Sequence, residues 1–355
     1  MMDRLRIDNH KLIYHVDRVK KWLDGESIYP IYMEISPSGA CNQRCSFCAF
    51  DYLKYKVRFI NTKKLLVFLS DAARLGVKSI MYAGEGEPLL HKDIKEMINY
   101  TKKVGIDTAL ATNGVLLDGD FSEGCLGSLS WLRFSINAGT NKTYAKIHRC
   151  KPQVFDVVIK NIETAVKIKK RKKYPCAIGI QFILLPENYK EIKRLAITLK
   201  RIGADYLTIK PFIRHPSQKS KIYNNLNYDN FIYLNENFQR LQSDDFDIYF
   251  RAHCMEKLNA DRSYRKCFGL PFFAEVTSDG NMYTCGPYLG NKRFCYGNIY
   301  RNSFKEIWNG KKRKQILKMV NKKLDVAQCM KSCRLDEINK YLWELKNPPP
   351  HVNFI

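Results

Sequence analysis

Short apolar runs and longer amphipathic stretches take turns along most of the chain. A short apolar run bounded by turn residues is typical of a buried strand, and apolar residues at every third or fourth position are typical of a helix. From residue 31 onward this rhythm predicts strands at 31–36, 78–83, 107–112, 131–136, 177–184 and 206–210, with helices between them that include 62–75, 91–104, 140–170 and 188–202. We therefore predict six β/α units.

Strands that are separated by helices form a parallel sheet with right-handed crossovers. Six units are too few to close an eight-stranded barrel. We therefore predict an α/β fold built on a partial, six-unit (β/α) barrel, whose reactive groups lie at the carboxyl ends of the strands. The polar clusters of this chain do follow the predicted strands at those ends, at 38–48, 84–88, 112–114 and 135–137.

The remaining segments predict a second, smaller domain. Apolar positions in 8–23 have helical spacing, and the polar stretch 217–247 predicts a loop and a helix that close the barrel. Two alternating runs around the turn Ser278–Asp279–Gly280 predict a β-hairpin, and helices are expected at 303–320 and 335–346. We assign 1–29 to an N-terminal helical segment, 30–247 to the barrel and 248–355 to a C-terminal domain with its final helix.

The composition limits the class of protein and the cellular compartment that we expect. A chain of 355 residues with 45% hydrophobic content can bury at least one full core. Its apolar runs are too short for a bilayer-spanning helix and its first residues are polar, so we expect a cytoplasmic protein with no membrane partner. The net charge of +25 favours an anionic partner. Lysine-rich helix faces at 167–173 and 311–314 also fit an ordinary solvated surface, so both interpretations stay open.

Three of the twelve cysteines, Cys41, Cys45 and Cys48, lie in a Cys-x-x-x-Cys-x-x-Cys spacing within one loop. In a cytoplasmic protein such cysteines favour metal ligation or buried thiols over disulfides. Three thiolates at these separations can hold three corners of a 4Fe-4S cubane and leave the fourth iron without a protein ligand. A zinc ion is the alternative, but it would take a fourth Cys or His nearby.

The segment from Ser38 to Cys48 resembles the signature loop of the radical S-adenosylmethionine (SAM) superfamily, including the aromatic residue Phe47 before the last cysteine. The resemblance implies that SAM chelates the open iron, with Phe47 among its contacts. It also implies that an electron from a donor such as flavodoxin or ferredoxin cleaves SAM to a 5′-deoxyadenosyl radical. That radical then takes a hydrogen atom from substrate.

Other stretches of the predicted barrel resemble the SAM-binding motifs of the same family. Gly86, Glu87 and Pro88 match its Gly-Gly-Glu-Pro loop, whereas Glu85 stands where a second glycine is usual. A glycine lets the backbone approach the ligand, and a carboxylate accepts hydrogen bonds from an ammonium group.

Strand-end polar residues form a further part of the resemblance, which implies SAM contacts for Asn113, Ser135 and Asn137. These residues could instead cap the turn or helix that follows. Gln181 on the fifth strand is a further candidate for the barrel mouth. The alternation of side chains along the strand does not show which face of the sheet it lies on. The pair His148–Arg149 is either an anion-binding pair or a solvated helix end.

A second set of cysteines, Cys267, Cys285, Cys329 and Cys333, resembles the ligand set of the twitch form of a SPASM-type auxiliary domain. Four thiolates close a cluster completely, so we predict one auxiliary 4Fe-4S cluster. A structural Cys₄ zinc site is the alternative. Cys295 is an open candidate to replace one ligand, and the other cysteines are expected to be buried small residues.

These features predict a radical SAM oxidoreductase. A closed auxiliary cluster offers no iron to substrate, so we expect it to accept an electron after hydrogen abstraction. By analogy with twitch-bearing relatives, the substrate would be a small carbohydrate-like or cyclitol-like alcohol, for which the charge also allows an anionic or nucleotide-linked form. The alternatives are a maturase of ribosomally made peptides and, from another class, an RNA-binding or RNA-modifying protein. A nucleic-acid partner is not expected, because the basic stretch 167–173 has only Tyr174 beside it. No catalytic residue or general base is assigned.

Overall fold

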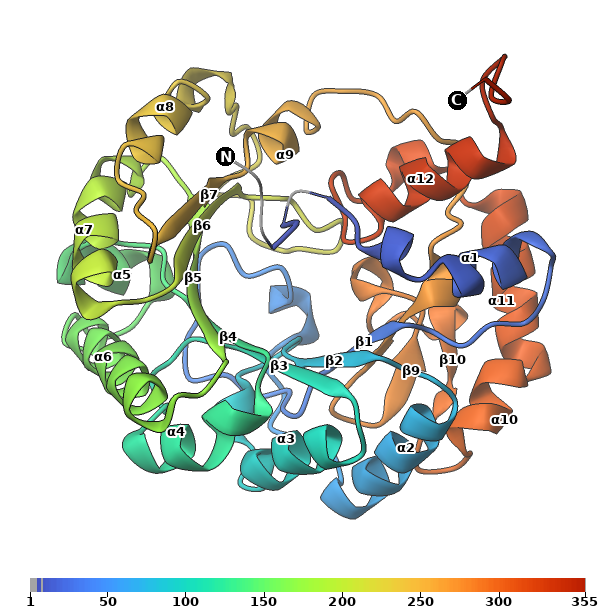
Figure 1. Ribbon diagram of the computed structural model, residues 1–355, viewed down its shortest axis with the longest axis horizontal. Coiled ribbons are helices and arrows are strands. Elements are labelled where there is room, and N and C mark those ends of the chain that lie inside the picture. Colours follow the sequence, from blue (N-terminus) through green and yellow to red (C-terminus); the bar gives the residue numbers. More distant parts are fainter. Residues whose placement is uncertain (1–4, 8, 355) are drawn as a thin grey trace.

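A computed structural model describes residues 5–7 and 9–354, and the strands of that part form one continuous sheet in the order β10-β9-β8-β1-β2-β3-β4-β5-β6-β7 (Figure 1). Residues 1–4 and 8 of the expected N-terminal helical segment, and Ile355, lie outside the described residues. The strands are β1 (Tyr32–Ile35), β2 (Ser79–Tyr82), β3 (Asp107–Thr112), β4 (Trp131–Ser135), β5 (Ala177–Leu184), β6 (Tyr206–Pro211), β7 (Asp247–Phe250), β8 (Phe273–Val276), β9 (Asn281–Tyr283) and β10 (Cys295–Asn298).

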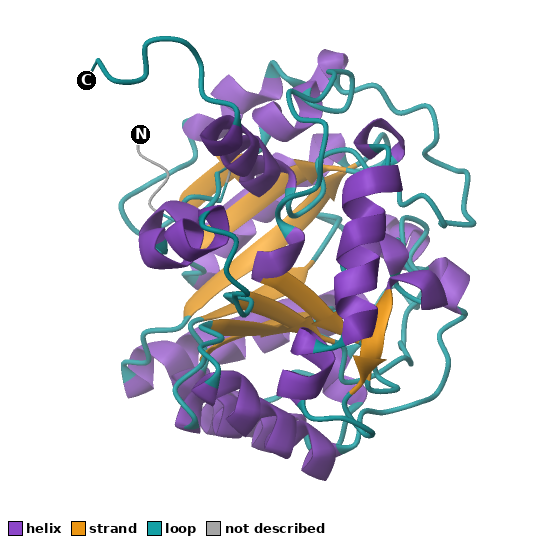
Figure 2. Ribbon diagram, turned by 90° about the vertical axis from the view of Figure 1, so that its right-hand side faces the viewer, coloured by secondary structure: helices purple, strands orange, loops and turns teal. Residues whose placement is uncertain are grey.

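The parallel part of the sheet, β1 to β7, curves into a partial barrel. Helices cover its outer side in both views (Figure 2). They are α2 (Thr62–Arg74), α3 (Ile94–Lys103), α4 (Gly119–Cys125), α5 (Asn141–His148), α6 (Val154–Lys172), α7 (Ile192–Ile202) and α8 (Leu234–Gln239). The α/β class and the partial barrel are therefore confirmed.

The barrel has one strand more than the six expected. β7 pairs in parallel with β6, from Tyr206 opposite Asp247 to Ile209 opposite Phe250. We expected only a loop and a helix in 217–247. The strand was missed because the four-residue run Asp247–Phe250 follows a long polar stretch. The expected domain boundary at 247 falls inside this strand, so the sheet of the barrel extends to Phe250.

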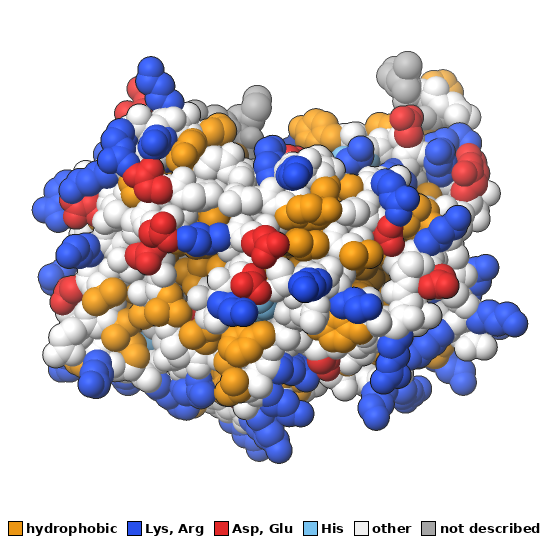
Figure 3. All heavy atoms as spheres, turned by 90° about the horizontal axis from the view of Figure 1, so that it is seen from below, with side chains coloured by type: hydrophobic (Ala, Val, Ile, Leu, Met, Phe, Trp, Pro, Cys, Tyr) orange, Lys and Arg blue, Asp and Glu red, His pale blue; other side chains and the backbone are white. Residues whose placement is uncertain are grey.

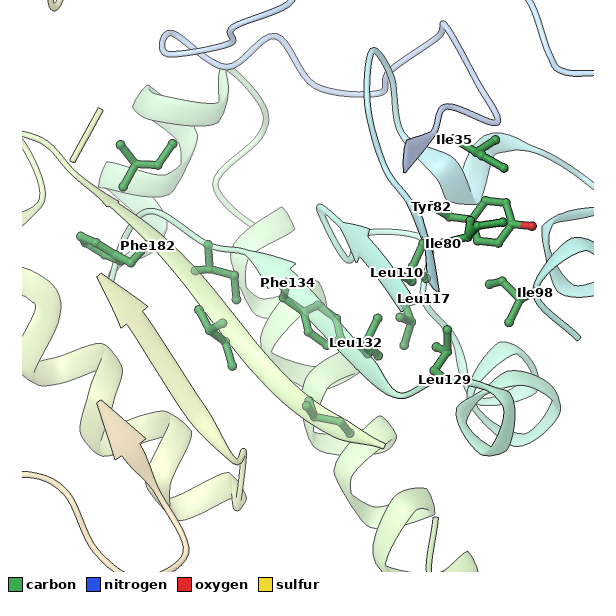
Figure 4. Packing of buried hydrophobic residues seen from close by; sticks show 14 of the residues in the cluster. Ile35, Ile80, Tyr82, Ile98, Leu110, Leu117, Leu129, Leu132, Phe134 and Phe182 are labelled. Carbon is green, nitrogen blue, oxygen red and sulfur yellow. The ribbon is translucent and has the colours of Figure 1, made fainter. Parts of the chain in front are cut away.

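The core lies between the sheet and its outer helices. Side chains alternate along a strand, so Leu132 and Phe134 of β4 face the helices, as does Leu110 of β3, and all three are fully buried. Figure 4 shows them grouped with Ile98 of α3. The other face of β4, which carries Trp131, Arg133 and Ser135, is only partly buried and points into the barrel.

Several helices are shorter than the pattern suggests. The stretch 140–170 forms two helices because Arg149 has φ of 51° and ends α5. The stretch 303–320 also divides, at Gly310, into α10 (Phe304–Asn309) and α11 (Lys311–Lys323). In 8–23 only Val16–Leu23 forms an α-helix, α1.

The C-terminal domain joins the sheet at the barrel's first strand. β8 pairs in parallel with β1, with Glu275 opposite Glu34, and then pairs antiparallel with β9. The predicted hairpin is therefore confirmed. The short helix α9 (Ala252–Glu256) precedes this domain, and α12 (Asp336–Lys346) ends it.

Basic side chains are spread over the face seen in Figure 3, where they are mixed with acidic and apolar ones. The expected solvated face at 311–314 needs one correction, because Arg313 is only 4% exposed and its guanidinium stacks 3.7 Å from the ring centre of Trp308. No helix in the described part of the chain has both the length and the apolar character needed to cross a bilayer.

Candidate functional site

The cysteine loop follows β1 at the carboxyl end of the barrel. Its start is anchored where the Gly39 N–H donates to the Arg58 carbonyl (2.9 Å). Its middle is bound to the last turn of α5, because the Ser46 N–H donates to the Ile147 carbonyl (2.8 Å). These backbone bonds hold the loop at the mouth and leave the cysteine thiols available.

Cys41, Cys45 and Cys48 share one desolvated site. Burial raises the pKa of the Cys41 thiol to about 11 and also raises the pKa of Cys45 and Cys48, and the neighbouring thiols raise the pKa of Cys45 further. Thiolates in such a site need cations to neutralise them, which cluster iron supplies. Among the described residues, no three His, Cys, Asp or Glu side chains are drawn together tightly enough for a single metal ion. The case for a cluster therefore rests on the loop spacing and on this shared burial.

His148, the last residue of α5, lies beside these thiols. Its Nδ1 is 3.3 Å from Cys45 Sγ and 3.0 Å from Gln43 Oε1. Its ring stacks on Tyr144, with ring centroids 4.1 Å apart. Burial lowers the pKa of His148 to about 3, so the imidazole is neutral at physiological pH.

The contacts of Asn137 fix the tautomer of this histidine. Asn137 Oδ1 accepts from the Ile183 N–H (2.6 Å), which can only be a donor, so the amide nitrogen of Asn137 faces His148 Nε2 (3.3 Å). Nε2 is therefore the acceptor and Nδ1 carries the proton. That proton points between Gln43 Oε1 and Cys45 Sγ.

Asn137, a predicted SAM contact, bonds to protein groups through its side chain. The side chain is 1% exposed and joins the end of β4 to β5 and to His148. Arg149, which follows His148 in the sequence, is exposed and caps the C-terminus of α5. The pair His148–Arg149 therefore does not form an anion site, because only His148 turns inward.

Gly86 packs directly against the cysteine loop. A Cβ at this position would lie 2.2 Å from the Ala40 carbonyl oxygen and 2.4 Å from that of Ser38, both of them backbone atoms that cannot move aside easily. Only glycine fits there. The glycine's role in this structure is thus to let the loop after β2 touch the loop that carries the cluster cysteines.

Glu87 is buried and holds the strand ends together. Its Oε1 accepts from the Thr112 hydroxyl (2.5 Å) and the Leu89 N–H (3.1 Å), and its Oε2 accepts from the Asn113 N–H (2.8 Å). A carboxylate has about four acceptor positions, so one position on Oε2 is left for a ligand ammonium group.

Asn113 has a similar structural role. Its Nδ2 donates to Asn42 Oδ1 in the cysteine loop (2.6 Å), and its own Oδ1 accepts from the Val115 N–H (3.0 Å). The turn-capping alternative therefore describes its side chain. It also joins the third strand end to the cluster loop.

Ser135 and Phe47 remain available to a ligand. Ser135 is half-buried on the inner face of β4, and its hydroxyl has no hydrogen-bond partner among the described residues. Phe47 is half-buried and meets the His148 ring edge-on at 5.7 Å.

Glu85, the departure from the family motif, contacts the C-terminal domain. Its carboxylate accepts from the Ser278 N–H (2.8 Å) and hydroxyl (2.5 Å) at the hairpin turn. It also pairs with Arg58 (2.7 Å), whose guanidinium reaches Asp279 (3.1 Å). Glu85 thereby fixes the hairpin turn against the mouth of the barrel.

The four C-terminal cysteines, Cys267, Cys285, Cys329 and Cys333, line one cavity of about 260 Å³. Burial raises the pKa of each of these thiols, and each of Cys285 and Cys333 also has its pKa raised by the neighbouring thiols of Cys267 and Cys329. Four converging, desolvated thiols match the donor set of a fully ligated cluster.

Cys295 lies apart from this group. It is buried, its thiol donates to the Gly297 carbonyl (3.4 Å), and it does not line the cavity. Among the other cysteines, Cys125, Cys176 and Cys254 are buried as expected, whereas Cys150 is half-buried and near enough to raise the pKa of Cys45.

The same cavity opens into the barrel. Besides the four cysteines, its wall includes Ala49 and Phe50, which come directly after Cys48. The inner wall consists of strand residues with polar or charged side chains, namely Glu34, Arg133, Gln181, Lys210 and Glu275. Gln181 therefore does face the interior, and the cavity extends from the four C-terminal cysteines to the residues that follow Cys48.

Arg133 and Lys210 were missed by the sequence analysis, although a signal was present. Each is a charged residue inside an otherwise apolar strand, and Arg133 stands two positions from Ser135, on the same face of β4. Strand parity would have placed its charge inside the barrel.

Comparisons with known proteins agree with this arrangement. The sequence profile of the radical SAM superfamily matches residues 35–199, and that of the SPASM iron-sulfur cluster-binding domain matches 267–334. Among curated proteins, the tungsten-containing aldehyde ferredoxin oxidoreductase cofactor-modifying protein of Pyrococcus furiosus is 24% identical, over 79% of this chain and 81% of its own. The GTP 3′,8-cyclase of Aquifex aeolicus is 27% identical, over 79% of this chain and 89% of its own.

Solved structures show the same fold. Streptococcus suis SuiB bound to its precursor peptide SuiA aligns with a TM-score of 0.66 and 18% identity, over 87% of this chain and 71% of SuiB. The enzyme anSMEcpe with bound SAM aligns with a TM-score of 0.58 and 19% identity, over 82% of this chain and 84% of its own. At these identities the likeness concerns the fold.

Proposed function

Because this chain belongs to the radical SAM superfamily and carries a SPASM domain, we propose that it dehydrogenates a small carbohydrate-like or cyclitol-like alcohol that binds between two iron–sulfur clusters. The observation that carries the proposal is the single cavity shared by the auxiliary cysteines and the residues after Cys48. A substrate in that cavity would lie near the four auxiliary cysteines and the residues that follow Cys48.

The cofactors are SAM and a 4Fe-4S cluster, with auxiliary iron–sulfur ligation in the SPASM domain. When bound, they supply a 5′-deoxyadenosyl radical and a site for one electron. We assign Cys41, Cys45 and Cys48 to the first cluster. Cys267, Cys285, Cys329 and Cys333 would hold a single auxiliary cluster. The outer electron source would be a small reductant protein such as a flavodoxin or ferredoxin.

The proposed oxidation balances within the cavity. The carbinol carbon of the substrate would give up a hydrogen atom to the 5′-deoxyadenosyl radical. The substrate radical would then lose one electron to the auxiliary cluster and its hydroxyl proton to a base or water, leaving a carbonyl group. The side chains suited to orient a polar substrate are Ser135 and Gln181, since both face the interior.

The peptide-maturase alternative gains nothing specific from the structure. SuiB is a peptide-bound neighbour, but the likeness to it concerns the fold only. The auxiliary cluster would occupy the part of the cavity between its four cysteines, and the space beside the charged inner wall suits a small polar molecule better than a peptide segment. The RNA-binding alternative would require affinity that falls steeply with salt.

The experiment is anaerobic reconstitution followed by reaction with SAM, reductant and alcohols deuterated at the carbinol carbon. We expect deuterium in 5′-deoxyadenosine together with a carbonyl product. Cys41→Ala should abolish SAM cleavage, and Cys285→Ala should abolish the oxidised product. Deuterium transfer with a redox-neutral product would overturn the oxidation, and transfer only from peptides would favour the maturase.

A further inference from the structure

We propose that Arg133 and Lys210 form an anchoring subsite for a phosphoryl group of the substrate, on the inner wall of the barrel. This inference rests on the proposed function in that it names the class of substrate for the same cavity. It predicts a phosphorylated alcohol or a nucleotide-linked one, not a neutral sugar or cyclitol.

The two side chains reach one cavity from different levels of the barrel wall. Ser135 of β4 lies opposite Gln181 of β5, which lies opposite Thr208 of β6. Arg133 stands one inward-facing position before this layer, and Lys210 stands one after it. Both line the cavity, and the Arg133 charge acts on Lys210.

The arginines on the cavity wall other than Arg133, and the carboxylate Glu34, have partners in the protein. Arg334 pairs with Glu34, which also accepts from the Tyr32 hydroxyl (2.7 Å). Arg262 donates to the Met330 carbonyl (2.7 Å). Arg251 also has an interaction partner in the protein.

Arg133 and Lys210 differ from these groups. Within the described residues, neither makes a hydrogen bond or an ion pair, and the Arg133 guanidinium lies 4.8 Å from the centre of the Trp131 ring. Glu34 attracts the Arg133 charge, but its direct partner is Arg334, and burial raises the pKa of the other wall carboxyl, Glu275, well above its usual range. Neither cation therefore has a carboxylate in direct contact.

Charge matching favours a phosphoryl group over a carboxylate. Two uncompensated cations in a partly desolvated site are costly until an anion neutralises them. A phosphate monoester carries close to two negative charges near neutral pH, whereas a carboxylate carries one and would leave one cation unmatched. Arginine binds two phosphate oxygens at once through its planar guanidinium, and lysine adds a point charge.

The place of the pair fits an anchor more than a reaction centre. Arg133 lies one inward-facing layer below Ser135, and Lys210 lies one layer above Thr208, nearer the mouth. A phosphoryl group held between their charged ends would lie beside the Ser135 layer and leave the rest of the molecule pointing toward Phe50 and Cys285. The carbon that reacts would then lie where both clusters can reach it.

The test uses the reconstituted holoenzyme and needs no turnover, so a wrong reaction assignment would not affect it. The clusters are first reduced to their paramagnetic 1+ state without SAM. Inorganic phosphate is then titrated and followed by cluster-induced ³¹P NMR relaxation, with acetate as the carboxylate probe in competition. We expect phosphate binding that Arg133→Gln and Lys210→Gln each weaken by about tenfold or more. Acetate should compete at least about tenfold less well than phosphate.

Control variants distinguish phosphate binding at this site from attraction by the overall positive charge of the protein. Lys167→Gln removes one exposed lysine and should leave phosphate binding unchanged. Lys210→Arg keeps the charge and should retain most of the binding, which separates lost contact from lost folding. Competition by ribose 5-phosphate or by uridine diphosphate then distinguishes a monoester substrate from a nucleotide-linked one.

Three results would overturn the proposal. They are the absence of cluster-induced ³¹P relaxation in the unmodified enzyme, equal phosphate binding in the Gln variants at unchanged iron content, and acetate competing as well as phosphate.

Discussion

The imidazole Nδ1 of His148 lies 3.3 Å from the Sγ of Cys45. Since the contact of Asn137 with Nε2 places the proton on Nδ1, the histidine presents an N–H to a sulfur that we assign to the SAM-binding cluster. Hydrogen bonds to ligand sulfurs are one of the means by which a protein sets a cluster's reduction potential.

The first prediction follows from this contact. His148→Phe keeps a ring stacked on Tyr144 but removes the N–H, so the reduced cluster loses a stabilising contact. A differential loss of about 1 kcal/mol corresponds to a potential lower by roughly 40 mV, since a factor of ten is 59 mV for one electron. An anaerobic redox titration followed by EPR measures it. Tyr144→Phe keeps the histidine and should shift the potential much less; an equal shift would contradict the assignment.

The second prediction concerns iron stoichiometry. Two cubanes correspond to about eight irons per chain. Cys285→Ala should lower the content toward about four and remove the auxiliary signal, whereas Cys295→Ala should keep both clusters because its thiol bonds to the Gly297 carbonyl. Iron and sulfide analysis with Mössbauer spectra decides. About four irons in the unmodified protein would disprove the auxiliary cluster.

The third prediction concerns Glu85. Glu85→Ala leaves Arg58 with Asp279 and the Ser278 hydroxyl, and leaves the Ser278 N–H without its acceptor. Breaking such a buried pair should lower the free energy of unfolding by about 3 kcal/mol, measured by denaturant unfolding of the reconstituted protein. Asp120→Ala, which removes the exposed partner of Lys95, should change it by less than about 1 kcal/mol. Similar losses in both variants would show that Glu85 has no special role.

The fourth prediction concerns Lys210, whose pKa is lowered to about 7 by burial and by Arg133, Arg251 and Arg334. A lysine that gives up its proton more readily in the folded state destabilises the fold while the unfolded chain still holds that proton. The penalty is complete below pH 7 and fades as pH rises toward the ordinary lysine pKa.

Lys210→Met should therefore stabilise the protein by about 1–2 kcal/mol at pH 7, a reduced figure because the cavity admits water, and by less at pH 9. Parallel denaturant titrations of variant and parent at both pH values measure this difference. A variant that is less stable at pH 7 would mean that the protein itself compensates the lysine charge.

The sequence predicted most clearly those features that depend on local spacing. The spacing of Cys41, Cys45 and Cys48 was enough to predict the cluster loop. The turn residues and the alternating runs on both sides of Gly280 were enough to predict the hairpin. The strand ends were also predictable, because a parallel sheet collects them at one edge whatever the details of packing.

Features that depend on which partner a side chain finds in space were beyond the sequence. The amides of Asn113 and Asn137, both predicted SAM contacts, bind Asn42 and Ile183 from other segments, and these partners are not visible in the sequence. The role of Glu85 likewise depends on Ser278, which is distant along the chain. β7 was missed because a short strand inside a polar stretch has too few residues to show a period.

The pairing of β8 with β1 has a consequence for how the protein is made. The barrel's first strand leaves the ribosome early, but its second neighbour, Phe273–Val276, is synthesised only in the last third of the chain. Until then the nascent barrel presents an open strand edge that invites association with other chains. If iron binds the cysteine loop during translation, it binds before β8 has completed the sheet. A chain that ends before β8 should aggregate and should not form a smaller enzyme.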